Sequence, residues 1–290
     1  MKPTFPKSFS MMLRKQTPLH PIAIILASII LLFCGCDHTL PQDNSFGIYL
    51  SADTDTVLAQ PAVDEIVIDA QYYSADDIRQ LKSRGSKVYS YLNIGSLEEF
   101  RDYYDRFADR TTGSYENWSD ERWIDVTDTD WQRFVSGTLA DELIAKEIDG
   151  FFVDNTDVYD QSPTRETFDG ILAILTGLAA KGLPVILNGG DHFVRRLLNG
   201  TAIPPFDGVC QESVVTTVTD YDNDEFGLQD EEATAYFYDY LTLCHQAGLR
   251  CYAVEYANTP ESNRAVTDFY RSRPWIHWYL ASSLSLKASQ

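Results

Sequence analysis

Eight short apolar segments constrain the fold of this chain more than any other feature of its sequence. They are rich in Val, Ile, Tyr and Phe, and most lack the polar–apolar alternation of half-exposed strands, as expected for parallel strands covered on both faces. Amphipathic stretches lie between them, and Gly85, Gly182 and Gly248 stand where three of these would end as helices. The candidate strands are 46–50, 65–70, 87–94, 150–154, 184–188, 208–212, 250–256 and 275–280, and the candidate helices are 75–84, 130–147, 165–181, 231–247 and 261–271.

This alternation predicts a single (β/α)8 TIM barrel, an α/β fold that typically takes ~250 residues. An open doubly wound sheet is the main alternative, and it is disfavoured because no glycine-rich phosphate loop follows the first strand. We expect the barrel over residues 46–283 and a C-terminal tail over 284–290. The longest connection, 95–149, should form an excursion over the barrel mouth.

The N-terminal region has the composition of an export signal. Four basic residues and no acidic ones precede an apolar run at 21–33, which is shorter than the ~20 residues of a membrane-spanning helix. Residues 1–35 are therefore expected to form a signal peptide. Cys36, preceded by Gly35, resembles the lipidated cysteine of bacterial lipoproteins. We expect an exported protein on a 36–45 tether, anchored to a membrane through Cys36 and facing the periplasm or cell exterior; free secretion is the alternative.

Acidic residues far outnumber basic ones. The 290 residues include 43 Asp and Glu against 23 Lys and Arg, a net charge of −20, and removal of residues 1–35 with their four bases deepens it to −24. Such a field repels phosphate, so nucleic acid is excluded as a partner. It favours a cationic or neutral ligand instead.

Acids and amides stand at the carboxyl ends of the candidate strands, where a (β/α)8 barrel has its active site. Several like charges in one small mouth cost free energy unless a ligand or shifted pKa values compensate. Glycoside hydrolysis requires two carboxyl groups that face the same cleft. The strand-end residues expected to contact a substrate are Asp69, Tyr91, Asn93, Asp157, Asn188, Asp191, Glu255 and Tyr279.

Asp154 and Glu212 are the favoured catalytic pair. Asp154 closes an apolar run and has an amide neighbour, Asn155, so it can stay ionised as a nucleophile. Glu212 has a longer side chain near an anion and should hold its proton, as a general acid requires. The alternative is structural: either acid could pair with an arginine or cap a helix.

No metal or other cofactor is expected, because the sequence contains no CxxC, HExxH or HxH pattern. The exported part has three cysteines, Cys210, Cys244 and Cys251. The last two can form a disulfide across a helix-to-strand turn, or all three can be buried free thiols.

Six motifs in sequence order resemble glycoside hydrolase family 114, whose members are endo-α-1,4-polygalactosaminidases with a TIM-barrel fold. The match spans nearly all of the expected barrel. The motifs are Tyr91-Leu92-Asn93-Ile94-Gly95-Ser96 with Glu99-Phe100-Arg101, then Trp123-Ile124-Asp125-Val126, Asp149-Gly150-Phe151-Phe152-Val153-Asp154-Asn155-Thr156-Asp157, Leu187-Asn188-Gly189-Gly190, Gln211-Glu212-Ser213 and Val254-Glu255-Tyr256.

The resemblance implies an enzyme that cuts galactosamine-containing exopolysaccharide inside the chain, with its catalytic Asp and Glu at Asp154 and Glu212. The arrangement in related retaining α-glycosidases makes Asp154 the nucleophile and Glu212 the acid/base. We expect a monomer. The alternatives are a lipoprotein that binds such polysaccharide without cutting it, or a glycosidase for another amino sugar or an α-galactoside. Four aromatic residues of the long connection can stack on sugars or pack this loop onto its barrel: Trp118, Trp123, Tyr103 and Tyr104.

Overall fold

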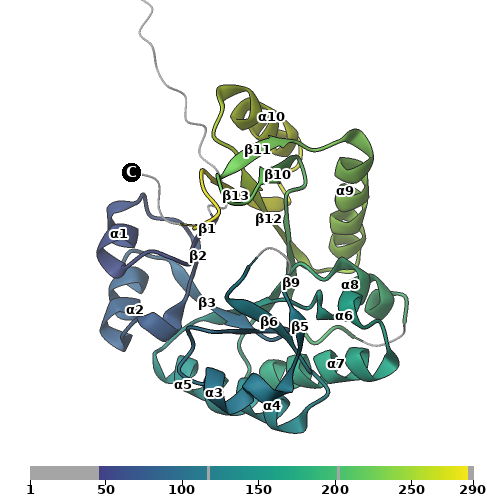
Figure 1. Ribbon diagram of the computed structural model, residues 1–290. Coiled ribbons are helices and arrows are strands. Elements are labelled where there is room, and N and C mark those ends of the chain that lie inside the picture. Colours follow the sequence, from purple (N-terminus) through teal and green to yellow (C-terminus); the bar gives the residue numbers. More distant parts are fainter. Residues whose placement is uncertain (1–45, 116–117, 201–202, 287–290) are drawn as a thin grey trace, which may run out of the picture. The chain divides into compact units, whose positions relative to one another are not determined.

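The computed structural model describes residues 46–115, 118–200 and 203–286, and its main element is an eight-stranded parallel sheet. Each strand pairs in parallel with the next. At the two edges the rings of Tyr49 and Tyr279 meet edge-on with centroids 5.5 Å apart, so the sheet forms a nearly closed barrel (Figure 1). In order around the barrel the strands are β1 (Phe46–Tyr49), β2 (Glu65–Ile68), β3 (Lys87–Asn93), β7 (Gly150–Asp154), β8 (Val185–Asn188), β9 (Gly208–Glu212), β12 (Arg250–Tyr256) and β13 (Ile276–Ala281).

Helices occupy the connections between these strands, so the predicted (β/α)8 fold is confirmed. Gly85, Gly182 and Gly248 follow three helices with φ of +96°, +77° and +84°, the left-handed conformation that ends helices at glycine. The predicted helix 130–147 is α-helical at both ends with a π-helical stretch, Phe134–Leu139, between them. The helices are α1 (Thr54–Ala59), α2 (Ala75–Lys82), α4 (Thr129–Arg133), α5 (Ala140–Ala145), α6 (Val158–Gln161), α7 (Arg165–Ala179), α8 (Asp191–Leu198), α9 (Glu231–Gln246) and α10 (Pro260–Arg271).

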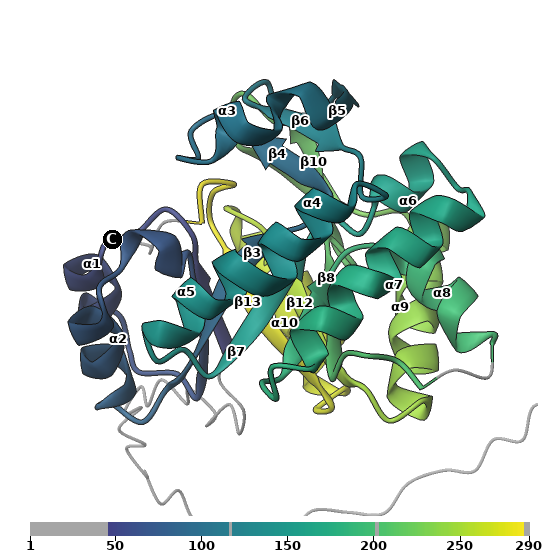
Figure 2. The same ribbon diagram turned by 90° about the horizontal axis from the view of Figure 1, so that it is seen from below.

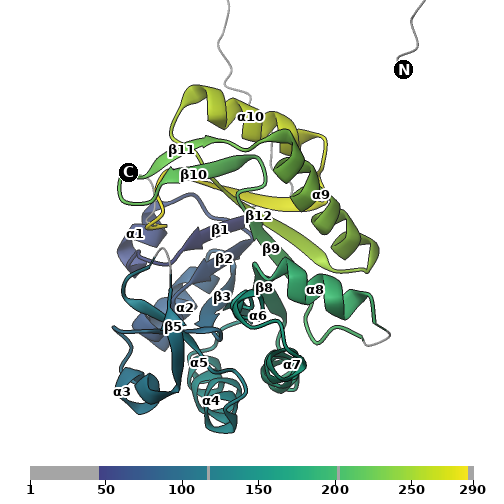
Figure 3. The ribbon, with the colours of Figure 1, turned by 45° about the vertical axis from the view of Figure 1, so that its right-hand side comes forward.

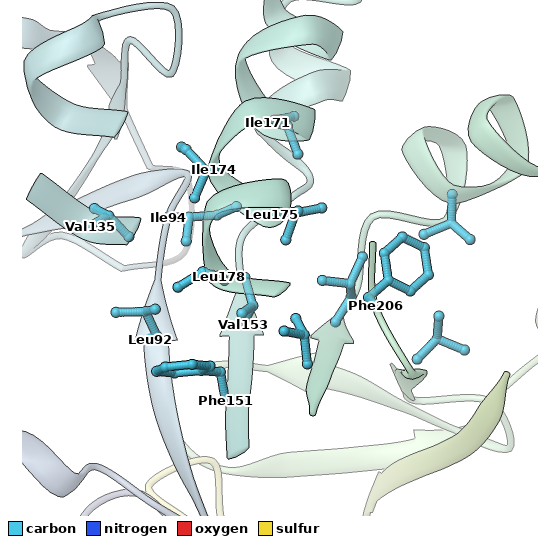
Figure 4. Close-up of a cluster of buried hydrophobic side chains, with 14 of the residues drawn as sticks. Leu92, Ile94, Val135, Phe151, Val153, Ile171, Ile174, Leu175, Leu178 and Phe206 are labelled. Carbon is cyan, nitrogen blue, oxygen red and sulfur yellow. The ribbon is translucent and has the colours of Figure 1, made fainter. Parts of the chain in front are cut away.

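The core has two parts because successive side chains of a strand point to opposite faces of the sheet. The outward side chains of β3 and β7 pack under the apolar face of α7, as Figure 4 shows for Leu92, Phe151 and Val153 beneath Ile174 and Leu178. The inward side chains, mostly aromatic and β-branched, form a second cluster that fills the barrel. The apolar faces of strands and helices therefore position the strand ends that carry the polar residues.

Two smaller sheets stand on the connections at one end of the barrel. The predicted excursion after β3 forms a three-stranded sheet of β4 (Ser96–Glu98), β6 (Glu121–Ile124) and β5 (Thr111–Ser114), with α3 (Tyr104–Phe107) beside it. Figure 2 shows this layer covering one end of the barrel. A hairpin of β10 (Thr216–Asp220) and β11 (Glu225–Leu228) follows β9 and runs past β12 (Figure 3).

The end of the described chain also belongs to the barrel mouth. Residues 284–286, part of the predicted C-terminal tail, line the same cavity as the strand ends. The backbone N–H of Leu284 donates to Asp224 on the hairpin at 2.8 Å. This contact places the segment against the body of the protein rather than beyond it.

The signal segment, Cys36 and the tether lie outside the described residues. Within the part of the chain that is described, no helix is long and apolar enough to cross a membrane. Cys210, Cys244 and Cys251 are buried free thiols, so the disulfide alternative between the last two is not formed.

Candidate active site

A cavity of about 870 Å³ opens at the carboxyl ends of the barrel strands. Strand ends form its floor, and the β4–β6–β5 layer, the β10–β11 hairpin and the 284–286 segment form its walls. Its described lining carries eight carboxyl side chains and one basic side chain, Arg101. The carboxyls are Asp53, Asp69, Glu98, Asp120, Glu121, Asp154, Asp157 and Glu212.

Three polar strand ends meet on the inner face of the barrel because each stands two positions after a residue of the interior cluster. The strands β7, β8 and β9 are consecutive in the sheet. Their C-terminal side chains therefore converge at one side of the cavity floor. The pairs are Phe152 before Asp154, Ile186 before Asn188 and Cys210 before Glu212.

A single amide nitrogen bridges the two acids. The Nδ2 group of Asn188 donates to Oδ1 of Asp154 at 3.0 Å and to Oε1 of Glu212 at 2.7 Å. The two accepting oxygens are therefore no more than about 5.7 Å apart. Each acid also accepts a tyrosine hydroxyl on its other oxygen, from Tyr91 to Asp154 at 3.0 Å and from Tyr256 to Glu212 at 2.7 Å.

Burial and, second to it, the nearby charge of Glu212 raise the pKa of Asp154, and hydrogen bonds from Asn188 and Tyr91 lower it, with a net value of about 6. Desolvation disfavours the charged form, and two like charges disfavour each other. Asp154 thus holds its proton more tightly than the sequence suggested. It is ionised above pH ~6 and protonated below it.

The residue after each of the two acids has a positive backbone φ angle. Asn155 has φ +65° and Ser213 has φ +57°, a region that residues other than glycine rarely occupy. Asn155 is buried and its amide donates to Ser96 of the excursion at 3.0 Å. Gly95 passes so close to this turn that a Cβ there would lie 1.8 Å from the Asn155 carbonyl oxygen. The turn after Asp154 therefore fastens the excursion to β7.

A buried ion-pair network forms the wall next to Tyr91. Arg101 donates to Glu98 at 2.5 Å and to Asp69 at 2.7 Å, and its side chain is 2% exposed. Burial raises the pKa of both acids, although the guanidinium acts against that shift. Asp69, expected at the substrate, thus lies in the cavity lining with its carboxylate paired to Arg101.

Asp157 lies in the cavity lining and accepts the backbone N–H of Gly190 at 2.8 Å. Burial raises its pKa to about 7. Gly190 has φ +70°, and a Cβ there would lie 1.9 Å from the hydroxyl of Thr156. The double-glycine turn after β8 therefore lets the two loops pack closely, with the second oxygen of Asp157 against Gly189.

Glu255 was expected at the substrate, but the structure places it elsewhere. Val254 and Tyr256 point into the barrel, so Glu255 between them points outward. It is fully buried and accepts the backbone N–H groups of residues 214–216 and the Tyr270 hydroxyl. Its position corrects the prediction of a substrate contact: Glu255 holds the loop that follows Glu212.

Three more predicted contacts lie outside the cavity lining. Asn93 is buried and donates to Ser96 at 2.7 Å, which secures the end of β3. Asp191 begins α8 and accepts the Tyr236 hydroxyl. Tyr279 contacts Tyr49 at the seam of the barrel. The expected substrate contacts are therefore corrected: each of these three side chains contacts a neighbouring element of the protein and supports the fold around the cavity.

The acid pair is hydrogen-bonded to one amide and two tyrosines. Asp160, Asp191 and His192 bring one ligand atom each within 4.8 Å of one another. They are partnered within the protein, since His192 bonds Asp160 at 2.9 Å. This group lies outside the cavity lining.

Sequence reasoning missed several lining residues. Tyr256 follows Val254 by two positions, so strand alternation could have identified it in place of Glu255. Glu98 and Glu121 come from the excursion, whose fold carries no periodic signal. Burial raises the pKa of Glu121 to about 7, and Ser96 donates to it at 2.6 Å.

Comparison with known proteins identifies the family, since the model of glycoside-hydrolase family GH114 matches residues 36–274. The chain belongs to glycoside-hydrolase family GH114. It is therefore a glycoside hydrolase, and the family resemblance of the six motifs is confirmed.

Two solved structures share the barrel fold seen here. The glycoside hydrolase domain of PelA from Pseudomonas aeruginosa has a TM-score of 0.68 at 19% identity, covering 84% of this chain and 96% of that one. Ega3 from Aspergillus fumigatus, solved as a complex with galactosamine, has a TM-score of 0.67 at 17% identity, covering 84% and 93%. No curated protein matches the chain in sequence. The structural likenesses independently support the fold.

Proposed function

We propose that this GH114 protein cleaves α-1,4-linked galactosamine polymers internally, with Asp154 as nucleophile and Glu212 as acid/base. The observation that carries the proposal is the Asn188 amide shared between the two acids. It limits the separation of the two facing oxygens to about 5.7 Å, which supports the close spacing of a retaining pair, ~5–5.5 Å, over the ~6.5–9.5 Å of an inverting pair.

The chemistry follows from these positions. Above pH ~6 the Asp154 carboxylate attacks the anomeric carbon while Glu212 gives its proton to the departing glycosidic oxygen. Glu212 then takes a proton from water, which attacks the same carbon and releases Asp154. Asn188 stays bonded to both acids and holds them at the distance that both steps need.

The charge of the cavity favours an amino sugar. Eight carboxyls and one paired arginine line it, and such a site concentrates a polymer that carries ammonium groups. Ega3, which has the same fold, was solved with galactosamine. The charge supports an amino sugar over an α-galactoside, and the Ega3 complex supports galactosamine over another amino sugar.

The deciding experiment compares the wild type with Asp154→Asn and Glu212→Gln on purified, partly deacetylated galactosamine polymer. We expect oligosaccharide release by the wild type and a fall in kcat of more than ~10³-fold in each variant, with little change in binding. Equal release from all three proteins would refute the catalytic assignment. Release from a different amino-sugar polymer alone would correct the substrate.

Stereochemistry and chemical rescue test the roles of the two acids. NMR of the first-formed product should show the α anomer, as a retaining mechanism requires. With an activated aryl glycoside, azide should rescue Glu212→Ala to a product of retained configuration and Asp154→Ala to one of inverted configuration. The opposite pattern would exchange the two roles.

The proposed location follows from the N-terminal segment. We expect the exported barrel to be a monomer held at a membrane by a lipid on Cys36. Cys36→Ala should move the protein from the membrane fraction to the soluble fraction, and light scattering of the soluble protein should give a single-chain mass.

A further inference from the structure

A second, smaller hollow adjoins the active-site cavity on the side of β2 and the excursion. It has a volume of about 230 Å³ and shares Tyr72, Phe100 and Arg101 with the main cavity. The shared residues form the boundary between the two hollows. A chain that leaves the acid pair in this direction therefore passes over the same two aromatic rings.

We call the rings of Tyr72 and Phe100 the aromatic shelf. They are 65% and 51% exposed, although exposed rings of this size carry an unfavourable contact with water. Of the seven large hydrophobic side chains that are exposed in the described ranges, four line the main cavity. Such a concentration at one opening marks a binding surface rather than chance exposure.

Arg101 holds the aromatic shelf in place from beneath. Its guanidinium lies 4.9 Å from the centre of the Phe100 ring and 5.6 Å from that of Tyr72. Glu98 and Asp69 fix the guanidinium from the other side at 2.5 and 2.7 Å. The rings are thus preorganised for a flat ligand face. Two acidic side chains are paired with the one cation, so the shelf presents no net positive charge to an ammonium group.

The charged groups beyond the aromatic shelf suit an amino sugar. Asp102 and Glu142 line the second hollow and are exposed. The only lysine of this lining, Lys146, is turned to the protein, because its amine donates to the carbonyls of Ala70 and Gln71 at 2.8 and 3.0 Å. The carboxylates therefore remain available to a ligand amine.

From these contacts we infer that the second hollow is a distal sugar subsite, in which the aromatic shelf stacks against the apolar face of a hexosamine and Asp102 or Glu142 binds its ammonium group. The inference rests on the proposed function, because it extends the same substrate beyond the cleavage point. It makes affinity depend on chain length, since only a polymer long enough to reach from the acid pair to the shelf makes both sets of contacts.

The test measures binding in the Asp154→Asn background, so that no substrate is consumed. Calorimetry compares Tyr72→Ala and Phe100→Ala on two probes, partly deacetylated galactosamine polymer and a galactosamine trisaccharide. Tyr236→Ala is the matched control, because Tyr236 is also exposed and lies outside both linings. Circular dichroism verifies that each variant is folded.

We expect each shelf variant to bind the polymer about tenfold more weakly and the trisaccharide less than about twofold more weakly. Asp102→Asn combined with Glu142→Gln should weaken binding of the deacetylated polymer but not of its fully N-acetylated form. Equal losses on both probes, or no loss on the polymer, would overturn the subsite.

The outcomes of these experiments test the proposed function and the distal subsite separately. A wild type that binds the polymer through the aromatic shelf but does not cut it would refute the catalytic proposal and keep the subsite. A wild type that cuts the polymer with undiminished affinity in both shelf variants would refute the subsite alone. A protein that neither binds nor cuts it would refute both.

Discussion

At the residue scale, the proposed chemistry depends on one amide between two acids. Asn188 is the group that touches both Asp154 and Glu212, and its N–H groups offset the repulsion between two carboxyls held this close. Without Asn188, burial and the charge of Glu212 would raise the pKa of Asp154 with one opposing hydrogen bond fewer. Asn188 is therefore a positioning residue that also tunes proton affinity.

Asn188→Ala should reduce kcat by about 100-fold with a smaller change in KM, because the amide positions the acids for the transition state. The acidic limb of the kcat/KM–pH profile should move from near pH 6 to higher pH, since the ionised form of Asp154 loses a hydrogen bond. Asn199→Ala, at the exposed end of α8, is the control. An unmoved acidic limb would show that Asn188 does not tune the pair.

Asp154→Asn should make the fold more stable while it removes activity. A carboxyl whose pKa rises from 3.8 to about 6 on folding binds its proton more tightly when folded, so its contribution to stability falls as pH rises through that window. At pH 7 the variant should gain up to about 3 kcal/mol, or roughly 6–12 °C in Tm. At pH 4 the gain should vanish.

Thermal unfolding between pH 4 and pH 8 measures this difference, with Asp239→Asn on the exposed face of α9 as the control. A Tm difference that stays constant with pH would mean that Asp154 is not destabilised by burial. The expected pattern is that of an active site whose carboxyls oppose the stability of their own fold.

At the element scale, the direction of a side chain along β12 separates function from support. Tyr256 points inward and donates to Glu212 at 2.7 Å. Glu255, one position earlier, points outward and accepts five hydrogen-bond donors from the loop after β9 and from α10. Adjacent residues of one strand thus orient Glu212 in two ways, directly and through its loop.

Glu255→Gln should lower the stability by about 2–3 kcal/mol, because an amide N–H₂ would face backbone donors and leave them without an acceptor. Tyr270→Phe removes one donor and keeps the ring, so it should cost only ~1 kcal/mol. Chemical denaturation measures both. A changed KM with unchanged stability in Glu255→Gln would instead indicate a substrate contact.

At the scale of the whole molecule, the net charge of −20 and the acidic cavity have the same sign. A field of this kind attracts a cationic polymer over distances comparable with the Debye length. The charge of the surface and the chemistry of the site therefore favour the same substrate.

Raising the ionic strength from about 20 to 500 mM should increase KM for deacetylated galactosamine polymer by about three- to tenfold, because salt shortens the screening length. The fully N-acetylated polymer carries no ammonium groups and should show a change of less than about twofold. Equal salt dependence for both polymers would mean that the charge serves solubility and not substrate capture.

The sequence by itself determined the barrel, because apolar runs with helical stretches between them leave few other ways to cover eight strands on both faces. The same runs end at Asp154, Asn188 and Glu212, so the residues of the acid pair and its bridge were visible as strand ends. Local sequence patterns were enough to find these three residues, because the C-terminal ends of all strands lie at the same face of a (β/α)8 barrel.

Only the tertiary structure decided which strand-end residues face the cavity. The inward or outward direction of Glu255 depends on the strand register, and a shift by one residue reverses it. The wall of Glu98, Arg101 and Glu121 comes from an excursion whose packing depends on contacts far apart in sequence. Long-range contacts of this kind leave no periodic pattern, which is why the strand-end residues of the cavity were predictable and the wall residues of the excursion were not.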